Sequence, residues 1–273
     1  MTENRIVTRT DGNVGIITIN NPARRNAISP ADAQAIAQAV RDFDEEPAVR
    51  AVVLRGEGGH FSAGGDLKAR PAGKRSVEEV RASLGRYADA VRAIQDSPKP
   101  VIALVRGCAF GGGMGLALAC DLVVVAKSAR LCCNFCRIGT VPELGLMLFM
   151  PQSMGMYRAK DLWFSGREIS GEQLYAWGAA SRLYDDDDIE AATLELAHDV
   201  AKTPALAVEI TKSIANGTNL SALPALLATE SQSSPFCTST EEHRALVEAF
   251  LNAKGKADRE TLPQEHQAKG RVA

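Results

Sequence analysis

The sequence lacks the features that mark several protein classes. It contains 31 Lys and Arg residues and 33 Asp and Glu residues, which gives a formal net charge of −2, and it has no long basic run. A nucleic-acid or anionic-membrane partner is therefore not expected. Every apolar run meets a charge, Gly or Pro before the roughly 20 residues needed to cross a bilayer, and residues 1–5 are too polar for a secretory signal. We expect a cytoplasmic protein without a membrane segment.

Cysteine is present, but not in the pattern of a disulfide framework or a complete metal site. Without an export signal, reduced thiols are expected. Cys133 and Cys136 form a C-x-x-C, which is half of a zinc site or a redox pair, yet no second C-x-x-C or H-x-x-x-H accompanies it. We interpret the cysteines as packing residues and expect no metal. The six are Cys108, Cys120, Cys132, Cys133, Cys136 and Cys237.

Hydrophobic residues make up 45% of the 273-residue chain, which is enough for one large core. Asp11-Gly12-Asn13 separates two β-rich runs and predicts a hairpin. Further on, β-rich and helical patterns alternate, which predicts an α/β fold of right-handed βαβ units. The β-rich runs lie at 6–10, 14–20, 51–54, 101–105 and 122–126, and the helical patterns at 29–43 and 77–95.

After about residue 150 the pattern becomes helical and rich in Ala and Leu. We expect an α/β core over residues 1–200 and a helical C-terminal region over 201–273, with a polar, mobile tail after Lys254. The expected helices lie at 159–164, 171–177, 189–202, 206–216, 223–231 and 241–253.

Two glycine-rich segments, 60–68 and 107–115, each follow a predicted strand. Small residues let a ligand approach the backbone, and the second segment leads into a helix whose first N–H groups are unpaired. Two such N–H groups pointing at one carbonyl oxygen would stabilise an enolate. Each segment alone is equally compatible with a tight turn, and neither has the spacing of a P-loop or a dinucleotide fold.

Taken together with other motifs, these segments resemble the crotonase superfamily of enoyl-CoA hydratases and isomerases along nearly the whole chain. The resemblance implies a spiral of repeated βαβ units, a C-terminal helical trimerisation region, and homotrimers or hexamers. It also implies an acyl-CoA thioester substrate, so that coenzyme A enters with the substrate and no separate cofactor is needed. The motifs are 21–27 (NPARRNA), 61–68 (FSAGGDLK), 99–103 (KPVIA), 111–113 (GGG), 120–121 (CD), 138–142 (IGTVP) and 165–170 (SGREIS).

The family's pattern also assigns roles to residues. It implies that the oxyanion donors are the N–H groups of Ala63 and Gly112, that residues 63–67 hold the adenine and pantetheine, and that Arg24, or Arg25 one residue on, binds phosphate. The implied substrate-binding set is Arg24, Arg25, Ala63, Gly64, Gly65, Asp66, Leu67, Lys68, Gly112 and Phe135.

The chain departs from the family where hydratases carry their two glutamates, because Gly115 and Phe135 stand there. Gly115 cannot hold a water through a side chain, and Phe135 would exclude one. Glu143 follows Pro142, at the place where isomerase branches carry a catalytic acid. Its apolar neighbours would raise its pKa and a helix start would lower it, and the same position suits a surface acid that pairs with a helix dipole.

These observations favour an isomerase, in which Glu143 shuttles a proton between C2 and C4 of an unsaturated acyl-CoA. Two alternatives stay open. One is a hydratase that uses Glu143 with an unaligned acid, and the other is a homologue that binds acyl-CoA without turnover.

Overall fold

The computed structural model describes residues 5–69 and 76–260, with side chains as far as 252. The chain begins with the predicted hairpin, in which β1 (Ile6–Asp11) pairs antiparallel with β2 (Val14–Ile19). Gly12 occupies the turn at φ 56°, a conformation that glycine adopts without steric cost. Every residue of β2 is buried, so this strand belongs to the interior of the sheet.

The main sheet has the order β1-β2-β3-β4-β6-β9. Its other strands are β3 (Ala51–Gly56), β4 (Val101–Val105), β6 (Leu122–Ala126) and β9 (Arg182–Tyr184), and they continue parallel from β2. A second sheet has the order β5-β7-β8, from β5 (Cys108–Phe110), β7 (Arg130–Cys132) and β8 (Glu168–Ser170). The chain visits the two sheets in turn, β4 then β5, β6 then β7, which confirms the predicted spiral of α/β units.

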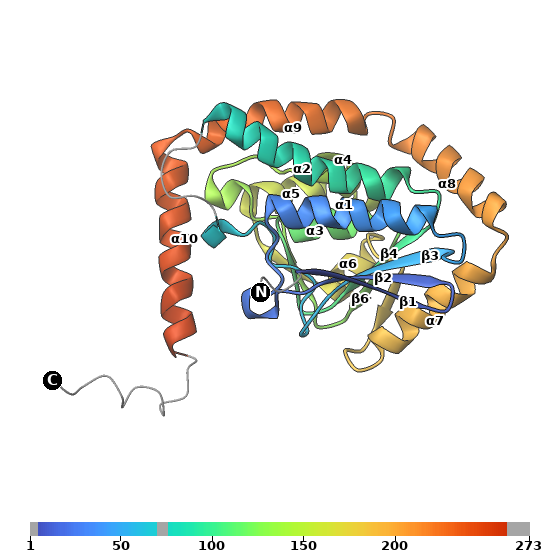
Figure 1. The fold of residues 1–273 in the computed structure, drawn as a ribbon. Coiled ribbons are helices and arrows are strands. Elements are labelled where there is room, and N and C mark those ends of the chain that lie inside the picture. The colour runs from blue at the N-terminus through green and yellow to red at the C-terminus, as the bar shows by residue number, and fades with distance from the viewer. Residues whose placement is uncertain (1–4, 70–75, 261–273) are drawn as a thin grey trace.

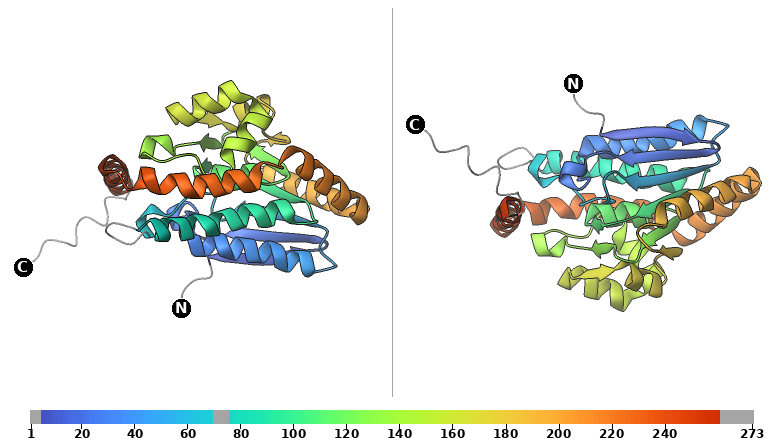
Figure 2. Two further views of the ribbon diagram at one scale, coloured as in Figure 1. Left: turned by 90° about the horizontal axis from the view of Figure 1, so that it is seen from above. Right: turned by 90° about the horizontal axis from the view of Figure 1, so that it is seen from below.

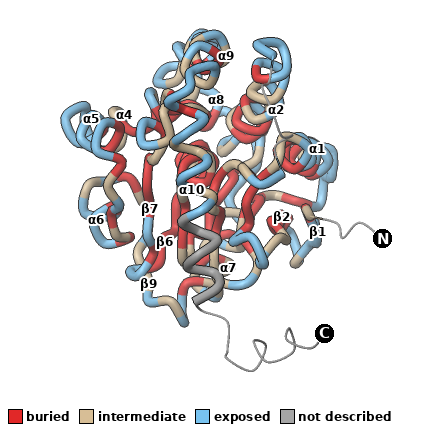
Figure 3. The backbone as a smooth tube through the Cα atoms, turned by 90° about the vertical axis from the view of Figure 1, so that its left-hand side faces the viewer, coloured by how far each residue is buried: buried red, intermediate tan, exposed pale blue. Residues whose placement is uncertain are grey.

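Helices cover the sheet on two sides. In Figure 1, α1 (Pro30–Glu45) and α2 (Val77–Asp96) lie above the main sheet, and α7 (Ile189–Lys202) packs below it. Ser29 and Ser76 begin α1 and α2, each accepting a hydrogen bond from a backbone N–H while an acid three residues on caps the serine N–H. Buried residues gather in the sheet and on the inward faces of the helices (Figure 3).

Four shorter helices follow: α3 (Gly112–Leu118) packs against β5 and α6 (Gly171–Ala176) against β8, while α4 (Leu146–Met154) packs against α3 and α5 (Met156–Ser165). The sequence pattern predicted a purely helical region after about residue 150, whereas β8 and β9 lie there. That part of the prediction was wrong, because strands of three residues carry too little periodicity to stand out beside helices.

The C-terminal helices are α8 (Ala205–Asn219), α9 (Leu223–Thr238) and α10 (Glu241–Glu260). Figures 1 and 2 show α8 arching around one end of the sheet, α9 running alongside α2, and α10 turning away at the far end. Helix α10 continues past Lys254, where a mobile tail was expected to begin, and residues 261–273 lie outside the described residues.

Lys212 fixes α8 to the sheet. The side chain is buried, and its ammonium donates to the Asp121 carboxylate at 2.7 Å and to the carbonyl of Ile94 at 2.8 Å. Asp121 also accepts the N–H of Val101 at 2.7 Å, so the acid links α8 to the start of β4. On its other face, α8 exposes Leu206, Ile210 and Ile214. None of the helices in the described ranges is both long and apolar enough to cross a membrane.

Candidate active site

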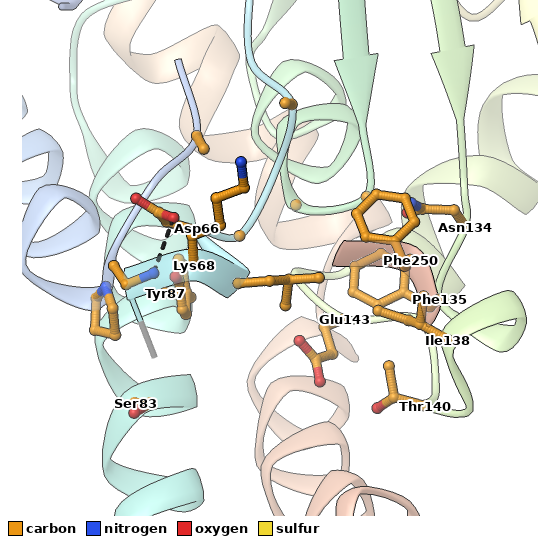
Figure 4. A pocket seen from close by; sticks show the side chains of 18 of the residues that line it. Asp66, Lys68, Ser83, Tyr87, Asn134, Phe135, Ile138, Thr140, Glu143 and Phe250 are labelled. Carbon is orange, nitrogen blue, oxygen red and sulfur yellow. Dashed lines mark hydrogen bonds between the residues drawn. The ribbon is translucent and has the colours of Figure 1, made fainter. Parts of the chain in front are cut away.

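One pocket brings together the two glycine-rich segments and the C-terminal helices. Its lining comes from the segments 23–30, 65–69 with Ala63, 111–112 and 134–144, and from α2, α9 and α10. Segments more than 100 residues apart in sequence therefore meet around one cavity of about 220 Å³. Figure 4 shows Glu143 between a polar side, with Asp66 and Lys68, and an aromatic side, with Phe135 and Phe250.

The two glycine-rich segments lie backbone against backbone. The Ser62 N–H donates to the Cys108 carbonyl, and the Phe110 N–H donates to the Ser62 carbonyl, both at 2.9 Å. A Cβ on Gly64 would lie 2.4 Å from the Phe110 carbonyl oxygen, and the φ of Gly64 is +87°. Only glycine satisfies both conditions, which explains why this part of the motif contains no larger residue.

The Gly112 N–H is available to a ligand. Gly112 is the first residue of α3, and the first N–H groups of a helix have no intrahelical partner. Within the described residues this N–H donates no hydrogen bond. It lies 3.2 Å from the place of a Cβ on Gly64, so it faces the neighbouring segment across the pocket floor.

The expectation that the Ala63 N–H is free was wrong. That group donates to the Arg25 carbonyl at 2.8 Å. The N–H of Asp66 is also used, by the Ile28 carbonyl at 2.8 Å. Between them, the positive φ of Gly64 turns the chain. In the described part of the molecule the Gly65 N–H donates no hydrogen bond, and it lies 3.8 Å from the place of a Cβ on Gly112. The available pair is therefore Gly65 and Gly112.

The acidic and basic residues beside the glycine segment are paired with each other. Asp66 is buried, and its two carboxylate oxygens accept from the Arg24 guanidinium at 2.9 and 3.0 Å. It also accepts the Ala69 N–H at 3.1 Å, which begins a short 3-10 helix, η2 (Leu67–Ala69). Arg24 thus has a partner at the pocket edge, whereas Arg25 is exposed there with φ 51°.

Glu143 lies in the pocket wall and is held by side chains from distant elements. The Ser234 hydroxyl, on α9, donates to Glu143 Oε1 at 2.7 Å. Ser234 is buried, and its oxygen lies 3.2 Å from the Thr140 hydroxyl. Glu143 is half-buried and lines the pocket beside Thr140 (Figure 4). The alternative of a simple surface acid is therefore not what the structure shows.

The chain turns sharply directly after Glu143. Leu144 has φ 61° and Gly145 has φ 75°; for leucine this left-handed conformation is uncommon. The Gly145 N–H donates to both oxygens of Glu230, on α9, at 3.2 and 3.3 Å. Burial, together with the nearby Glu143 charge, raises the pKa of Glu230 to about 8, even though the Gly145 N–H acts to lower it.

Of the two positions where hydratases carry glutamates, one has no room for a side chain and the other is occupied by an aromatic ring. A Cβ on Gly115 would lie 2.7 Å from the Cβ of Leu144, closer than atoms of this kind approach. Phe135 is buried and lines the pocket next to Phe250 and Ile138 (Figure 4). An apolar surface therefore stands where hydratases hold water.

Helices α2 and α10 supply the remaining sides of the pocket. Tyr87, on α2, donates its hydroxyl to the Ile28 carbonyl at 2.7 Å and leaves its ring at the cavity. The His243 Nδ1–H, on α10, donates to the Ile138 carbonyl at 2.5 Å, next to a second 3-10 helix, η3 (Cys136–Ile138). This contact holds α10 beside the cavity, which Phe250 helps to line.

The cysteines take no part in the pocket lining. Cys133 is buried, and burial raises its pKa. Burial also raises the pKa of Cys132 to about 11, and its Sγ contacts the Gly166 carbonyl at 3.0 Å. In the part of the chain that the structure describes, no three His, Cys, Asp or Glu side chains form a cluster suited to a metal ion.

Most residues singled out from the sequence meet at this pocket. Gly64 is the exception, since it packs behind the lining. Sequence reasoning missed Thr140, Leu144, Glu230 and Ser234, because no local pattern links a helix near residue 230 to a loop near residue 143. Those that line the pocket are Arg24, Arg25, Ala63, Gly65, Asp66, Leu67, Lys68, Gly112, Phe135 and Glu143.

Comparison with known proteins gives one consistent family. A sequence model described as Enoyl-CoA hydratase/isomerase matches residues 9–259. The chain is 37% identical over 205 residues to a "Putative enoyl-CoA hydratase" of Thermus thermophilus, covering 74% of this chain and 80% of the relative. It is 30% identical over 250 residues to a "1,2-epoxyphenylacetyl-CoA isomerase" of Escherichia coli, covering 90% and 95%.

A solved structure agrees with these sequence matches. An enoyl-CoA hydratase from Mycobacterium avium subsp. paratuberculosis superposes with a TM-score of 0.83 at 26% identity, over 92% of this chain and 96% of that one. Since the family match covers most of the chain and the fold extends over nearly all of it, the protein is a member of the enoyl-CoA hydratase/isomerase family of the crotonase superfamily.

Proposed function

We propose that this protein is an enoyl-CoA isomerase, which moves a double bond of an acyl-CoA thioester through an enolate. The position of Glu143 is the observation that carries the proposal. Its carboxylate lines the pocket and is held by Ser234 at 2.7 Å, whereas the two hydratase positions are Gly115 and Phe135. Among the described residues of the pocket lining, Glu143 is thus the acid suited to proton transfer, since the Asp66 carboxylate is paired with Arg24.

In the proposed mechanism, the thioester oxygen accepts hydrogen bonds from the N–H groups of Gly65 and Gly112. Glu143 removes a proton from C2 of a 3-enoyl-CoA, and the electron pair of the broken C–H bond delocalises onto that oxygen. The same carboxyl group then returns the proton at C4, so that the double bond shifts to C2–C3. Each donor to such an oxyanion is typically worth about 2.7–4 kcal/mol of barrier.

We assign binding of the coenzyme A part of the substrate to the edge of the pocket, where Arg24, Arg25 and Lys68 lie. Arg25 is the better candidate for a phosphate, because Arg24 is already paired with Asp66. Coenzyme A enters with the substrate, so the mechanism requires no further cofactor.

The second candidate function is hydration of a 2-enoyl-CoA. The name of the Thermus thermophilus relative favours hydration, and that of the Escherichia coli relative favours an isomerase. Hydration here would have to use Glu143 with a water placed by some other group, because neither Gly115 nor Phe135 offers a polar side chain.

The decisive experiment follows 3-enoyl-CoA and 2-enoyl-CoA in deuterated water, with the wild type and Glu143→Gln. We expect the wild type to convert the 3-enoyl to the 2-enoyl thioester. Because the amide cannot accept the proton, Glu143→Gln should lower kcat by about 10²- to 10⁴-fold. Bond migration and 3-hydroxyacyl-CoA formation are separated by chromatography and mass spectrometry.

Glu172→Gln is the matched control, since Glu172 is an exposed carboxylate on α6 that does not line the pocket. It should behave as the wild type. Hydration that survives Glu143→Gln, with no bond migration in the wild type, would rule out the isomerase. Tight acyl-CoA binding without turnover or deuterium exchange would favour a non-catalytic homologue.

We further propose that the protein assembles as a homotrimer or hexamer. The support is α8, on which Leu206, Ile210 and Ile214 form an exposed stripe at helical spacing. A mass measurement of the purified protein by light scattering tests this, and a monomer at micromolar concentration would contradict it.

A further inference from the structure

Leu144 combines an unusual backbone conformation with an unusual position. Its φ of 61° is the left-handed region, which side chains other than Asn and Asp seldom adopt. The side chain is buried and lines the pocket directly after Glu143 in the chain. A conformation of this kind persists only where the surroundings hold it.

The Leu144 side chain fills the space above helix α3. Its Cβ lies 2.7 Å, and its Cδ2 3.5 Å, from the place of a Cβ on Gly115. Its two methyl carbons lie 3.8 and 3.9 Å from the place of a Cβ on Gly112. One apolar side chain therefore covers the position where a hydratase glutamate would project and the edge of the proposed oxyanion site.

Side chains of α9 hold the turn that contains Leu144. Glu230 is buried on α9 and accepts the Gly145 N–H, and Ser234, one helical turn further, holds Glu143. The same helix therefore places the acid and the leucine, so that their relative position is set by one rigid element. Substitution of Leu144 by glycine keeps this backbone conformation accessible, which makes the side chain testable without disturbing the turn.

We propose that Leu144 is a specificity-determining residue, whose side chain keeps water away from the enolate and so commits it to reprotonation. The inference rests on the proposed isomerase function. When the proton of C2 has passed to Glu143, the apolar cover slows its exchange with solvent. When Leu144 is removed, water reaches the carboxyl group and C3, and a glutamate at residue 115 gains the room that it lacks.

The first test measures proton retention. A 3-enoyl-CoA deuterated at C2 is converted in ordinary water, and the deuterium found at C4 of the product is measured by mass spectrometry. We expect Leu144→Gly to retain at least threefold less deuterium than the wild type, and Leu144→Ala to lie between them. Met147→Ala is the control, since Met147 is partly exposed on α4 and does not line the pocket; its retention should equal that of the wild type.

The second test measures hydration of 2-enoyl-CoA and does not depend on isomerase activity. It compares Gly115→Glu, Leu144→Gly and the double variant. Gly115→Glu alone should form little 3-hydroxyacyl-CoA, because its Cβ meets Leu144, whereas the double variant should form it at least tenfold faster. Thermal unfolding of each variant checks that it is folded. If the double variant is unfolded, the deuterium retention measured for Leu144→Gly tests the proposal by itself.

Wild-type retention in Leu144→Gly would overturn the role of Leu144, as would hydration by Gly115→Glu alone at the rate of the double variant. These results are distinguishable from failure of the proposed function. A wild type that moves no double bond rules out the isomerase, while the comparison of the two Gly115→Glu variants still tests whether Leu144 closes the site.

Discussion

The floor of the pocket is built from backbone, whereas its wall is built from side chains. The floor consists of residues 61–66 and 110–112, joined by main-chain hydrogen bonds, and it offers the N–H groups of Gly65 and Gly112. The wall consists of Thr140, Glu143 and Ser234, joined by hydroxyl and carboxylate contacts of 2.7 and 3.2 Å. The two surfaces face one cavity but depend on different kinds of interaction.

The difference determines how each surface responds to substitution. In the floor, a side-chain atom either clashes with a neighbouring carbonyl, as at Gly64, or leaves the N–H unchanged. A substitution in the floor should therefore either abolish activity or leave it nearly unchanged. In the wall, a hydroxyl or carboxylate can be removed without moving the backbone, and the expected response is graded.

Among substitutions that leave the acid Glu143 in place, removal of one floor donor should have the largest effect. Gly112→Pro deletes the N–H at the first position of α3, where proline is tolerated, and Gly111 lies outside the α region that a following proline disfavours. We expect kcat/KM to fall by about 10²- to 10³-fold. Steady-state kinetics measures it.

Gly112→Ala is the matched control. It adds a Cβ whose nearest neighbours are at 3.8 Å and keeps the N–H, so most of the activity should remain. Equal losses in the alanine and proline variants would show that bulk, and not the donor, matters at this position.

The buried acid behind the wall should make stability depend on pH. Because burial raises the pKa of Glu230 from 4.5 to about 8, the folded protein keeps a proton that the unfolded chain releases between those values. The free energy of unfolding of the wild type should therefore fall as the pH rises from about 5 to about 8, by at most about 1.4 kcal/mol per unit.

Glu230→Gln removes this titration and should show a flatter profile over the same range. Urea unfolding at pH 5, 6.5 and 8 measures both proteins. Parallel plots of unfolding free energy against pH for the two proteins would mean that Glu230 is ionised in the folded state. The Gly145 N–H would then be bound by a carboxylate and not by a neutral carboxylic acid.

The smallest effect is expected from a single hydroxyl of the wall. Ser234→Ala removes the hydrogen bond that orients Glu143, and a hydrogen bond to a charged group is worth about 1.5–3 kcal/mol. Because part of this is recovered from water, we expect kcat to fall by about 5- to 20-fold with KM within about twofold.

Thr229→Ala serves as the control on the same helix, since the Thr229 hydroxyl is exposed and contacts only the Ala225 carbonyl in the described structure. It should leave kcat unchanged. An increase in KM alone for Ser234→Ala would place this serine in substrate binding and not in the orientation of the acid.

The floor was largely predictable from sequence because its signals are local. Two glycine-rich segments after β-rich runs indicated where N–H groups would be exposed, and the resemblance to the family singled out Gly112 among them. The prediction that Ala63 supplies the second donor was wrong. Whether the N–H of residue 63 or of residue 65 is free depends on the φ of Gly64 and on the Arg25 carbonyl, and neither is a property of the segment itself.

The wall was only partly predictable. Glu143 was found through the family's pattern, but Ser234, which holds it, lies 91 residues further along the chain. Likewise, the steric conflict between Leu144 and residue 115 exists only because the 142–146 loop packs on α3. Neither contact has a sequence signature.

The sequence by itself determined the hairpin, the capped helices, the α/β alternation and the glycine segments, because each depends on hydrogen bonds and steric limits within a few residues. Only the tertiary structure decided which N–H groups stay free, which side chain steadies Glu143 and which one occupies the hydratase position. Those features depend on the approach of elements far apart in the chain, and the distances that govern them exist only once the helices have packed on the sheet.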